Sequence, residues 1–297
     1  MPSAKDIKKK IRSTSNTKKI TRTMEMVATV KSKLATDRIK ATTPYATKLA
    51  EILGSLAGAG TIDHPLIEKP DAPEPKKVLV VVVTANRGLA GGYNAKVLQT
   101  GEHWLREQRS AGREVQIYMI GKKGISRCKF LKIPLAKAMT QFKDLPAFRE
   151  AEELAEELMT RFLAGEVDRV VMVGTRYVSQ SVQKPEVFQL LPIPALRPDA
   201  TEAGAGGKAR RTVEFIFEPG PEEILKSLLP LSVKTAVYRT LVEAAASEQV
   251  ARRVAMKLAT DNAEEMIKIF TRNYNRQRQA GITRQITEIV SGADALE

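Results

Sequence analysis

The last third of the chain, from about Pro221 to Val290, has apolar residues at steps of three and four positions. The members of this series are Val233, Val237, Leu241, Ala244, Ala245, Ala251, Ala255, Leu258, Met266 and Ile269. This spacing is typical of one face of a helix. At about 1.5 Å per residue, the roughly 60 residues from Leu231 onward would form a rod of roughly 90 Å, about twice the width of a globular domain of this size. A rod of that length cannot bury its own apolar face, so the pattern predicts a second long helix beside it.

The N-terminal residues supply a matching pattern. Apolar residues recur at helical spacing at Ile7, Ile11, Ile20, Met24, Val27, Leu34, Ala41, Tyr45, Leu49, Ile52 and Leu56. The glycines from Gly54 to Gly60 predict the end of this helix, and Pro44 inside it predicts a kink or a local break. We expect the two terminal helices to pair antiparallel as a coiled coil.

The residues between these helices alternate between strand and helix patterns. Buried strands are predicted at 76–84, 114–120 and 168–175, helices at 95–109, 121–130 and 148–164, and further strands at 187–192 and 212–217 around a loop at 201–208. This alternation predicts right-handed crossovers and an α/β domain. The fold class is therefore α/β plus a long α-helical coiled coil, with a Rossmann-like α/β domain inserted between two antiparallel terminal helices.

The same reading divides the chain into four parts. They are an N-terminal helix at 1–60, a proline-rich linker at 61–76, the inserted α/β domain at 77–218 and a C-terminal helix at 219–297. The longest apolar run, Val78 to Val83, is too short to cross a bilayer, and the N-terminus has no apolar signal core.

Charge is distributed unevenly along this chain of net charge +14. Residues 1–60 hold 13 basic and four acidic residues, whereas residues 221–297 hold 11 and 10. An acid-free stretch near the C-terminus contains Lys268, Arg272, Arg276, Arg278 and Arg284. Such charge suits nucleic acid or an acidic protein surface. Because no known nucleic-acid-binding motif accompanies the stretch, a protein partner is favoured, with a basic nucleic-acid-binding coiled-coil protein as an alternative.

No residue pattern predicts catalysis or cofactor binding. The loop 85–94 follows a strand and precedes a helix, but its glycines at 88, 91 and 92 fit neither phosphate-binding motif. A tight turn is favoured there, with a nucleotide-binding α/β enzyme as the alternative. His64 and His103 lack partners at metal spacing. Cys128 lies between Arg127 and Lys129, which could lower its pKa, but it has no nearby base. We therefore expect no catalytic residue, no metal and no cofactor.

Three stretches together resemble the gamma subunits of F-type ATP synthases. They are IKKKIRSTSNTKKITRTMEMVATVK from Ile7, VTANRGLAGGYN from Val83, and SEQVARRVAMKLATDNAEEMI from Ser247 with YNRQRQAGITRQITEIVSGA from Tyr274. The resemblance covers essentially the whole chain. It implies a non-catalytic subunit that serves as a central rotor shaft, coupling rotation of the c-subunit ring to sequential changes at the beta-subunit catalytic sites.

The resemblance also implies partners, a location and contact residues. The implied partners are three alpha and three beta subunits, the epsilon subunit and the c-subunit ring, with no nucleic acid and with membrane association only through the complex. The long cysteine-bearing insert of chloroplast relatives is absent, which favours a bacterial-type subunit at the cytoplasmic face of the plasma (inner) membrane. By position, the implied partner-contact residues are Met24, Arg252, Gln279, Thr283 and Glu288.

Overall fold

The computed structural model describes residues 4–58, 64–69, 73–194 and 220–294. Two long helices, α1 (Ala4–Gly58) and α5 (Pro221–Asp294), begin and end the described chain. The chain forms two compact units: residues 1–29 with 252–297 are unit 1, and residues 30–251 are unit 2. Both long helices contribute to both units. The four-part division expected from the sequence stays a prediction, because its boundaries at 60 and 218 lie outside the described residues.

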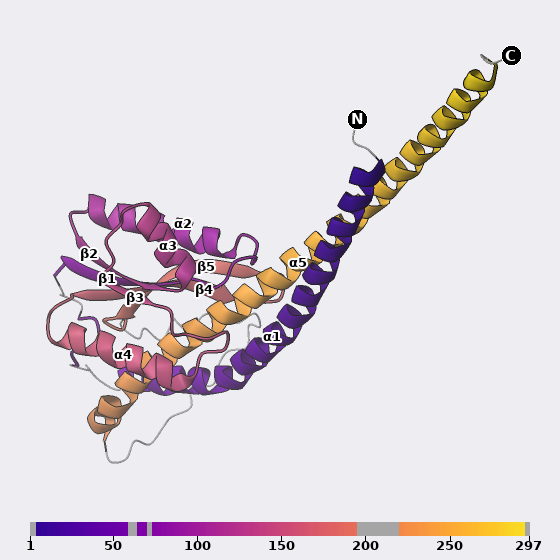
Figure 1. The fold of residues 1–297 in the computed structure, drawn as a ribbon. Coiled ribbons are helices and arrows are strands. Elements are labelled where there is room, and N and C mark those ends of the chain that lie inside the picture. The colour runs from indigo at the N-terminus through magenta and orange to yellow at the C-terminus, as the bar shows by residue number, and fades with distance from the viewer. Residues whose placement is uncertain (1–3, 59–63, 70–72, 195–219, 295–297) are drawn as a thin grey trace. The chain divides into compact units, whose positions relative to one another are not determined.

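The predicted α/β part lies in unit 2 and is a five-stranded sheet with helices on both faces (Figure 1). Its elements are β1 (Lys77–Val83), α2 (Tyr93–Ser110), β2 (Glu114–Ile120), α3 (Lys122–Phe130), β3 (Lys137–Met139), α4 (Phe148–Leu163), β4 (Arg169–Tyr177) and β5 (Gln183–Leu191). The strand order is β3-β2-β1-β4-β5, with all pairs parallel except β4 with β5. The fold class is confirmed. The strand predicted at 212–217 and the loop at 201–208 lie outside the described residues.

The centre of the sheet is buried on both faces, as its valine-rich strands predict. Six of the seven residues of β1 are buried. One core, which includes Val80, Val82 and Val97, lies between the sheet and the helices α2 and α3. The second core joins Leu79 and Val81 to α4, α5 and the second half of α1. Figure 1 shows α2 and α3 on one face, with α4 and α5 on the other.

The α5 segment Thr240–Val250 is the most enclosed part of unit 2. Every residue in it is buried except Glu248, which is half-buried. α5 lies very close to the sheet at this segment. A Cβ atom added to Gly174 of β4 would lie only 2.9 Å from Cγ2 of Thr240 in α5. The helix is therefore an internal element of unit 2 rather than a cover over the sheet.

Polar contacts fix α5 against its neighbours in unit 2. Lys234 Nζ donates to Glu152 and Glu156 of α4 at 2.8 and 2.6 Å, and these two carboxylates raise the pKa of Lys234. Arg38 of α1 donates to the Tyr238 hydroxyl at 3.0 Å. These contacts join α1, α4 and α5 into one packed layer.

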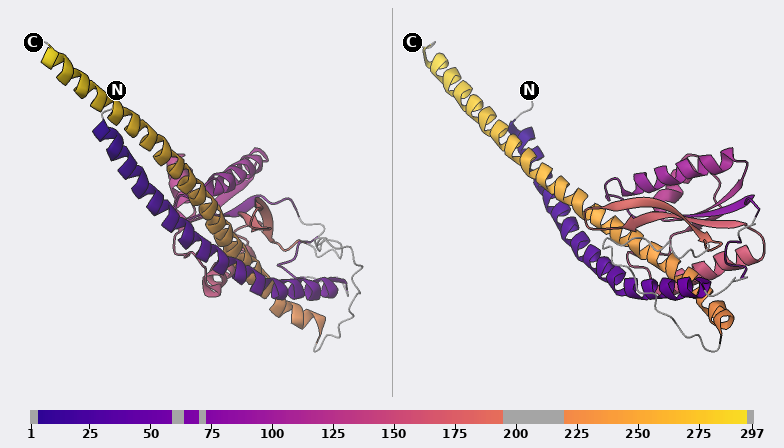
Figure 2. Two further views of the ribbon diagram at one scale, coloured as in Figure 1. Left: turned by 90° about the vertical axis from the view of Figure 1, so that its right-hand side faces the viewer. Right: turned by 180° about the vertical axis from the view of Figure 1, so that it is seen from behind.

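Pro44 does not interrupt α1. The helix is continuous from Ala4 to Gly58, so the alternative of a local break is wrong. The second half of α1 runs beside α5 and bends (Figure 2), which fits the predicted kink. Burial of Leu49, Leu53 and Leu56 explains why the helix continues, because these leucines pack in the core shared with α4 and α5.

Candidate functional site

Unit 1 consists of the first part of α1 paired with the second part of α5. The two helices face each other through positions spaced alternately by three and four residues, the repeat of a coiled coil. On α1 the buried and half-buried seam positions are Ile7, Ile11, Thr14, Lys18, Thr21, Glu25 and Ala28. On α5 they are Met256, Thr260, Ala263, Ile267, Phe270, Tyr274 and Gln277.

Polar contacts set the register of this pair. Lys18 Nζ donates to Glu264 at 3.0 Å, and the Thr21 and Thr260 hydroxyl oxygens lie 2.9 Å apart. The Thr260 hydroxyl also lies 2.8 Å from the carbonyl oxygen of Met256 in its own helix. Residue numbers rise along α1 while those of their partners fall along α5, which confirms the antiparallel pairing.

Many apolar residues of unit 1 lie outside the seam. Ile20, Met24 and Val27 of α1 are exposed, as are Leu258, Met266 and Ile269 of α5. We expected these side chains to face the partner helix, and for them that expectation is wrong. The seam holds alanine and threonine at several positions instead, and these small residues allow the helices to approach closely. The helix pair therefore presents apolar residues outward, a feature typical of a surface that binds another protein.

The end of α5 carries a further exposed apolar stripe of this unit. All side chains from Arg278 to Ser291 are exposed. Ile282, Ile286, Ile289 and Val290 are spaced by four, three and one, so they lie on one side of the helix. Ile286 and Ile289 are 57% and 72% exposed. The stripe was missed because the apolar series read from the sequence ended at Ile269.

All five residues implied as partner contacts lie in unit 1. Met24 is 38% exposed on α1, and Arg252 is half-buried on α5. Gln279 and Thr283 are exposed and share one side of α5, where the Thr283 hydroxyl donates to the Gln279 carbonyl at 3.0 Å. Glu288 is also exposed, but it lies about 140° around the helix from Thr283. The structure thus brings together Gln279 and Thr283 and separates Glu288 from them. The roles of all five stay predictions.

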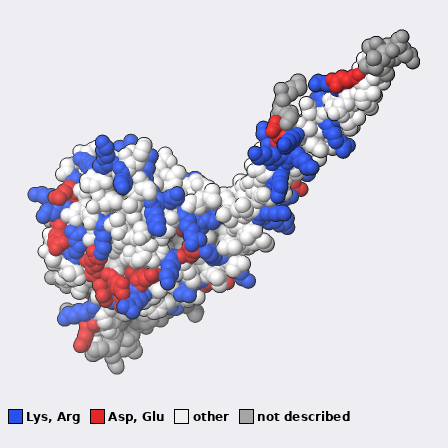
Figure 3. Space-filling view, in the orientation of Figure 1, with Lys and Arg blue, Asp and Glu red and all other residues white. Residues whose placement is uncertain are grey.

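Unit 1 is also strongly basic. Its sequence contains 16 lysine and arginine residues against eight aspartate and glutamate residues. Lysine and arginine side chains gather on the first turns of α1 and recur along α5 (Figure 3). The exposed surface therefore combines apolar stripes with positive charge, a pairing that suits a partner with apolar and acidic groups.

Among these charges, Glu264 is the carboxylate most affected by its surroundings. The hydrogen bond and charge of Lys18, together with Lys268, hold its pKa below the ordinary value. A carboxyl group with a lowered folded-state pKa stabilises the fold above its unfolded pKa of about 4.3, and this contribution is lost as the pH falls through the folded pKa.

We therefore expect Glu264→Gln to destabilise the chain slightly at pH 7 and to have less effect as the pH falls through the folded-state pKa, because the wild-type carboxylate then becomes protonated. The effect is small because the pair is exposed to solvent. Urea unfolding followed by circular dichroism from pH 7 to pH 3 measures it, with the adjacent Glu265→Gln as the control. A difference between wild type and Glu264→Gln that stays constant over this range contradicts the prediction.

The loop after β1, considered above as a phosphate site, is a structural turn. Leu89 and Gly91 have φ angles of 60° and 53°, and Asn94 Oδ1 accepts the Ala85 N–H at 2.9 Å. The adjacent cavity holds only about 40 Å³ because Leu241 and Ala244 of α5 form part of its wall. That volume suits a few water molecules rather than a nucleotide.

The surroundings of the cysteine and of one histidine are resolved. Burial, and to a lesser extent the charge of Glu102, raises the pKa of the Cys128 thiol and outweighs the lowering effect of Arg127. His64 Nδ1 accepts the Leu66 N–H at 3.2 Å. Among the described residues there is no group of three or more histidine, cysteine, aspartate or glutamate side chains placed to hold a metal. Within the described ranges, none of the helices has the length and apolar character needed to cross a membrane.

Comparisons with known proteins agree with this arrangement. A family model described as ATP synthase matches residues 3–296. The ATP synthase gamma chain of Leptospira biflexa serovar Patoc is 44% identical over 297 residues, and that of Gemmatimonas aurantiaca is 42% identical over 298 residues, each covering all of both chains. A chain of the Euglena gracilis mitochondrial ATP synthase shares the fold, with a TM-score of 0.65 at 19% identity, covering 99% of this chain and 94% of that one. On this evidence the chain belongs to the family of ATP synthase gamma chains.

Proposed function

We propose that this chain is the central rotor shaft of a proton-translocating ATP synthase, coupling rotation of the c-subunit ring to sequential conformational changes at the beta-subunit catalytic sites. The observation that carries the proposal is the similarity to gamma chains over the whole length. The apolar residues that the paired terminal helices present outward agree with it. As a gamma chain, it is a non-catalytic component of the ATP synthase complex. Neither alternative, a nucleic-acid-binding protein or a nucleotide-binding enzyme, has support from the comparisons.

The packing suits the transmission of torque. Long helices are only marginally stable alone, and most of their stability comes from tertiary packing. In unit 1 the seam of α1 and α5 supplies this packing. In unit 2 the segment Thr240–Val250 is enclosed by its neighbours, so a rotation of the surrounding α/β part would turn α5 with it.

The proposed partners are those that the resemblance to gamma subunits implies. In our proposal the paired terminal helices stand, through their unit 1 residues 1–29 and 252–297, inside a collar of three alpha and three beta subunits, which covers the exposed apolar stripes. The inserted domain at 77–218 meets the epsilon subunit and the c-subunit ring. The chain is thereby held at the cytoplasmic face of a bacterial inner membrane as a peripheral subunit.

The five implied contact residues take specific roles within this proposal. Met24 faces an acidic loop of a beta subunit, and Arg252 contacts the collar from α5. Gln279, Thr283 and Glu288 contact the collar near the end of α5. Arg252 is half-buried and the other four residues are exposed, which is compatible with these roles.

Co-purification tests the proposal directly. An affinity-tagged chain expressed in its native host is isolated with mild detergent, and the masses and amounts of its companions are measured. We expect alpha and beta subunits in threefold excess over the tagged chain, together with epsilon and c subunits. Recovery of the chain alone, or predominantly with nucleic acid, would refute the rotor assignment.

The proposed contact of Met24 has its own test. Met24→Lys introduces a cation opposite the proposed acidic loop, and a new exposed ion pair is worth about 1 kcal/mol. If the pair forms in only one rotational state, that energy corresponds to about a fivefold effect on the rate of leaving that state. We expect proton pumping per ATP hydrolysed to fall in reconstituted vesicles, while Met24→Leu keeps normal coupling. Normal coupling in Met24→Lys would contradict the proposed contact.

A further inference from the structure

A second, larger cavity lies within unit 2, between α5 and the strands β4 and β5. Its volume is about 310 Å³, within the range of sites for small organic molecules. Its walls include Arg176, Glu186 and Phe188 of the strands and Ala236, Arg239 and Glu243 of α5. None of these residues belongs to the contact surface described for unit 1.

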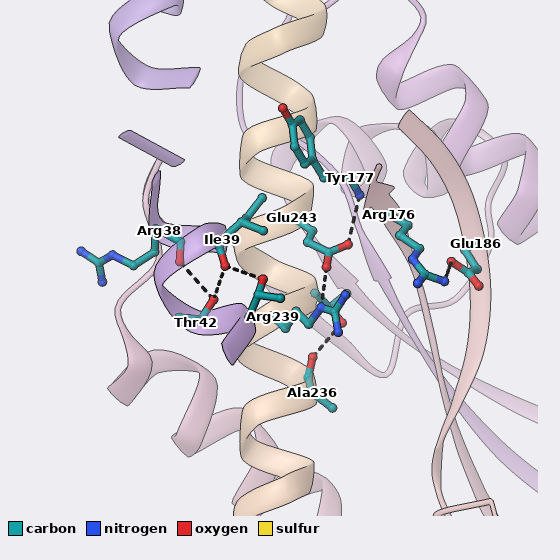
Figure 4. A network of polar contacts seen from close by, with 11 residues as sticks. Arg38, Ile39, Thr42, Arg176, Tyr177, Glu186, Ala236, Arg239 and Glu243 are labelled. Carbon is teal, nitrogen blue, oxygen red and sulfur yellow. Dashed lines mark hydrogen bonds and ion pairs between the residues drawn. The ribbon is translucent and has the colours of Figure 1, made fainter. Parts of the chain in front are cut away.

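The acidic groups of this cavity already have partners. Glu243 is only 5% exposed, and its Oε1 accepts Arg239 Nε at 2.6 Å while its Oε2 accepts the Tyr177 backbone N–H at 3.0 Å (Figure 4). Glu186 pairs with Arg176 across the two strands at 3.8 Å. The four charged side chains sum to zero, so the cavity neither repels nor strongly attracts a charged ligand as a whole.

Two wall residues of the cavity have unused donors: Arg239, and Thr175, whose buried hydroxyl has no hydrogen-bond partner among the described residues. Arg239 is the charged one of the two. Its Nε is held by the buried Glu243 carboxylate, which fixes the plane of the guanidinium group. In the described part of the chain its two terminal amino groups have no hydrogen-bond partner, and the side chain is 43% exposed at the cavity. A guanidinium group presented in this way offers two parallel N–H donors, the geometry that recognises a carboxylate.

The uncharged part of the wall consists of Phe188 and Ala236 together with Gly174 and the threonines Thr175 and Thr240. Phe188 presents an aromatic side chain, and Ala236 leaves space beside it. We propose that this cavity binds a small monocarboxylate with a flat apolar body, whose two oxygens accept from the terminal amino groups of Arg239 while the body lies against Phe188 and Ala236. The net charge of +14 on the chain favours the approach of an anion. The inference concerns unit 2 alone and does not rest on the proposed rotor role.

Binding of benzoate to the full-length chain, measured by isothermal titration calorimetry, tests the proposal. Benzamide is the neutral probe of nearly the same shape. We expect saturable binding of benzoate and binding of benzamide at least tenfold weaker. Arg239→Lys keeps the positive charge that faces Glu243 but removes the planar fork, so it should weaken benzoate binding at least tenfold. Ala236→Leu fills the cavity and should abolish binding.

The chain offers a matched control for Arg239. Arg149 of α4 pairs with Glu153 through the same Nε to Oε1 contact at the same four-residue spacing, but on an open surface. Arg149→Lys should leave benzoate binding unchanged. Circular dichroism confirms that each variant is folded before its affinity is compared. Absence of saturable benzoate binding to the wild type, equal affinity for benzamide, or unchanged affinity in folded Arg239→Lys overturns the proposal.

Discussion

Replacement of both Ile286 and Ile289 by lysine is expected to leave the isolated chain folded and to abolish its coupled activity in the ATP synthase. Both side chains are largely exposed in the chain alone, so their loss removes no internal packing. Lysine is a good helix former and suits the C-terminal end of a helix, where the helix dipole favours a cation. The free energy of unfolding of the isolated chain should therefore change by less than about 0.5 kcal/mol.

In the assembled complex the same two positions are expected to be covered by the collar. Burial of an isoleucine contributes about 1.5 to 3 kcal/mol, so loss of two such contacts weakens the interaction by roughly 3 to 6 kcal/mol, more than a hundredfold in affinity. Burial of the ammonium groups adds to this cost. Proton-driven ATP synthesis by reconstituted complex measures the effect. Thr287→Lys with Ser291→Lys, on another side of α5, is the control. Equal losses in the two double variants would show that the stripe has no special role.

Gly121→Ala is expected to be the most damaging small substitution in unit 2. Gly121 joins β2 to α3 with φ 96° and ψ 138°, a conformation that is essentially restricted to glycine. An added Cβ would lie 2.1 Å from the carbonyl oxygen of Thr84, which is backbone and cannot rotate away. The strained backbone costs about 1 to 3 kcal/mol and the steric overlap a further 1 to 3 kcal/mol. The expected loss in unfolding free energy is thus about 2 to 6 kcal/mol.

Gly112→Ala separates the two causes. Gly112 also has a positive φ, 73°, but an added Cβ meets nothing within 4 Å. Its substitution should cost only the backbone term, about 1 to 2 kcal/mol. Urea unfolding of both variants, followed by circular dichroism, gives the comparison. If the two variants lose the same stability, the overlap with Thr84 is relieved at no cost and the argument from close packing is wrong.

The regular elements were predictable because their periodicity is strong. The run of valines in β1 and the apolar spacing of α4 each identify one element almost to its ends. β3 has only three residues and offers no period to count. The antiparallel direction of β5 was also missed, because direction depends on the short connection after Tyr177 rather than on the pattern inside the strand.

The seam of the helix pair was harder to predict than the helices themselves. Counting apolar residues placed Ile20 and Leu258 in the contact, yet both are exposed, whereas the buried positions include Thr21 and Thr260. A threonine can be buried when its hydroxyl forms hydrogen bonds within its own helix and with the neighbouring helix. The residue type alone does not predict that burial. The cavity at Arg239 was also invisible in the sequence, because its wall combines residues from β4, β5 and α5.

The enclosure of Thr240–Val250 has a consequence for biosynthesis. The ribosome completes all five strands of the sheet before it makes this segment. The sheet face that bears Leu79 and Met172 therefore cannot be fully buried until α5 has been synthesised. The nascent chain thus exposes apolar sheet surface over roughly the time needed to add the residues from Pro192 to Val250. Translation must be almost finished before the sheet can bury this face, and chaperone protection is needed most during that interval.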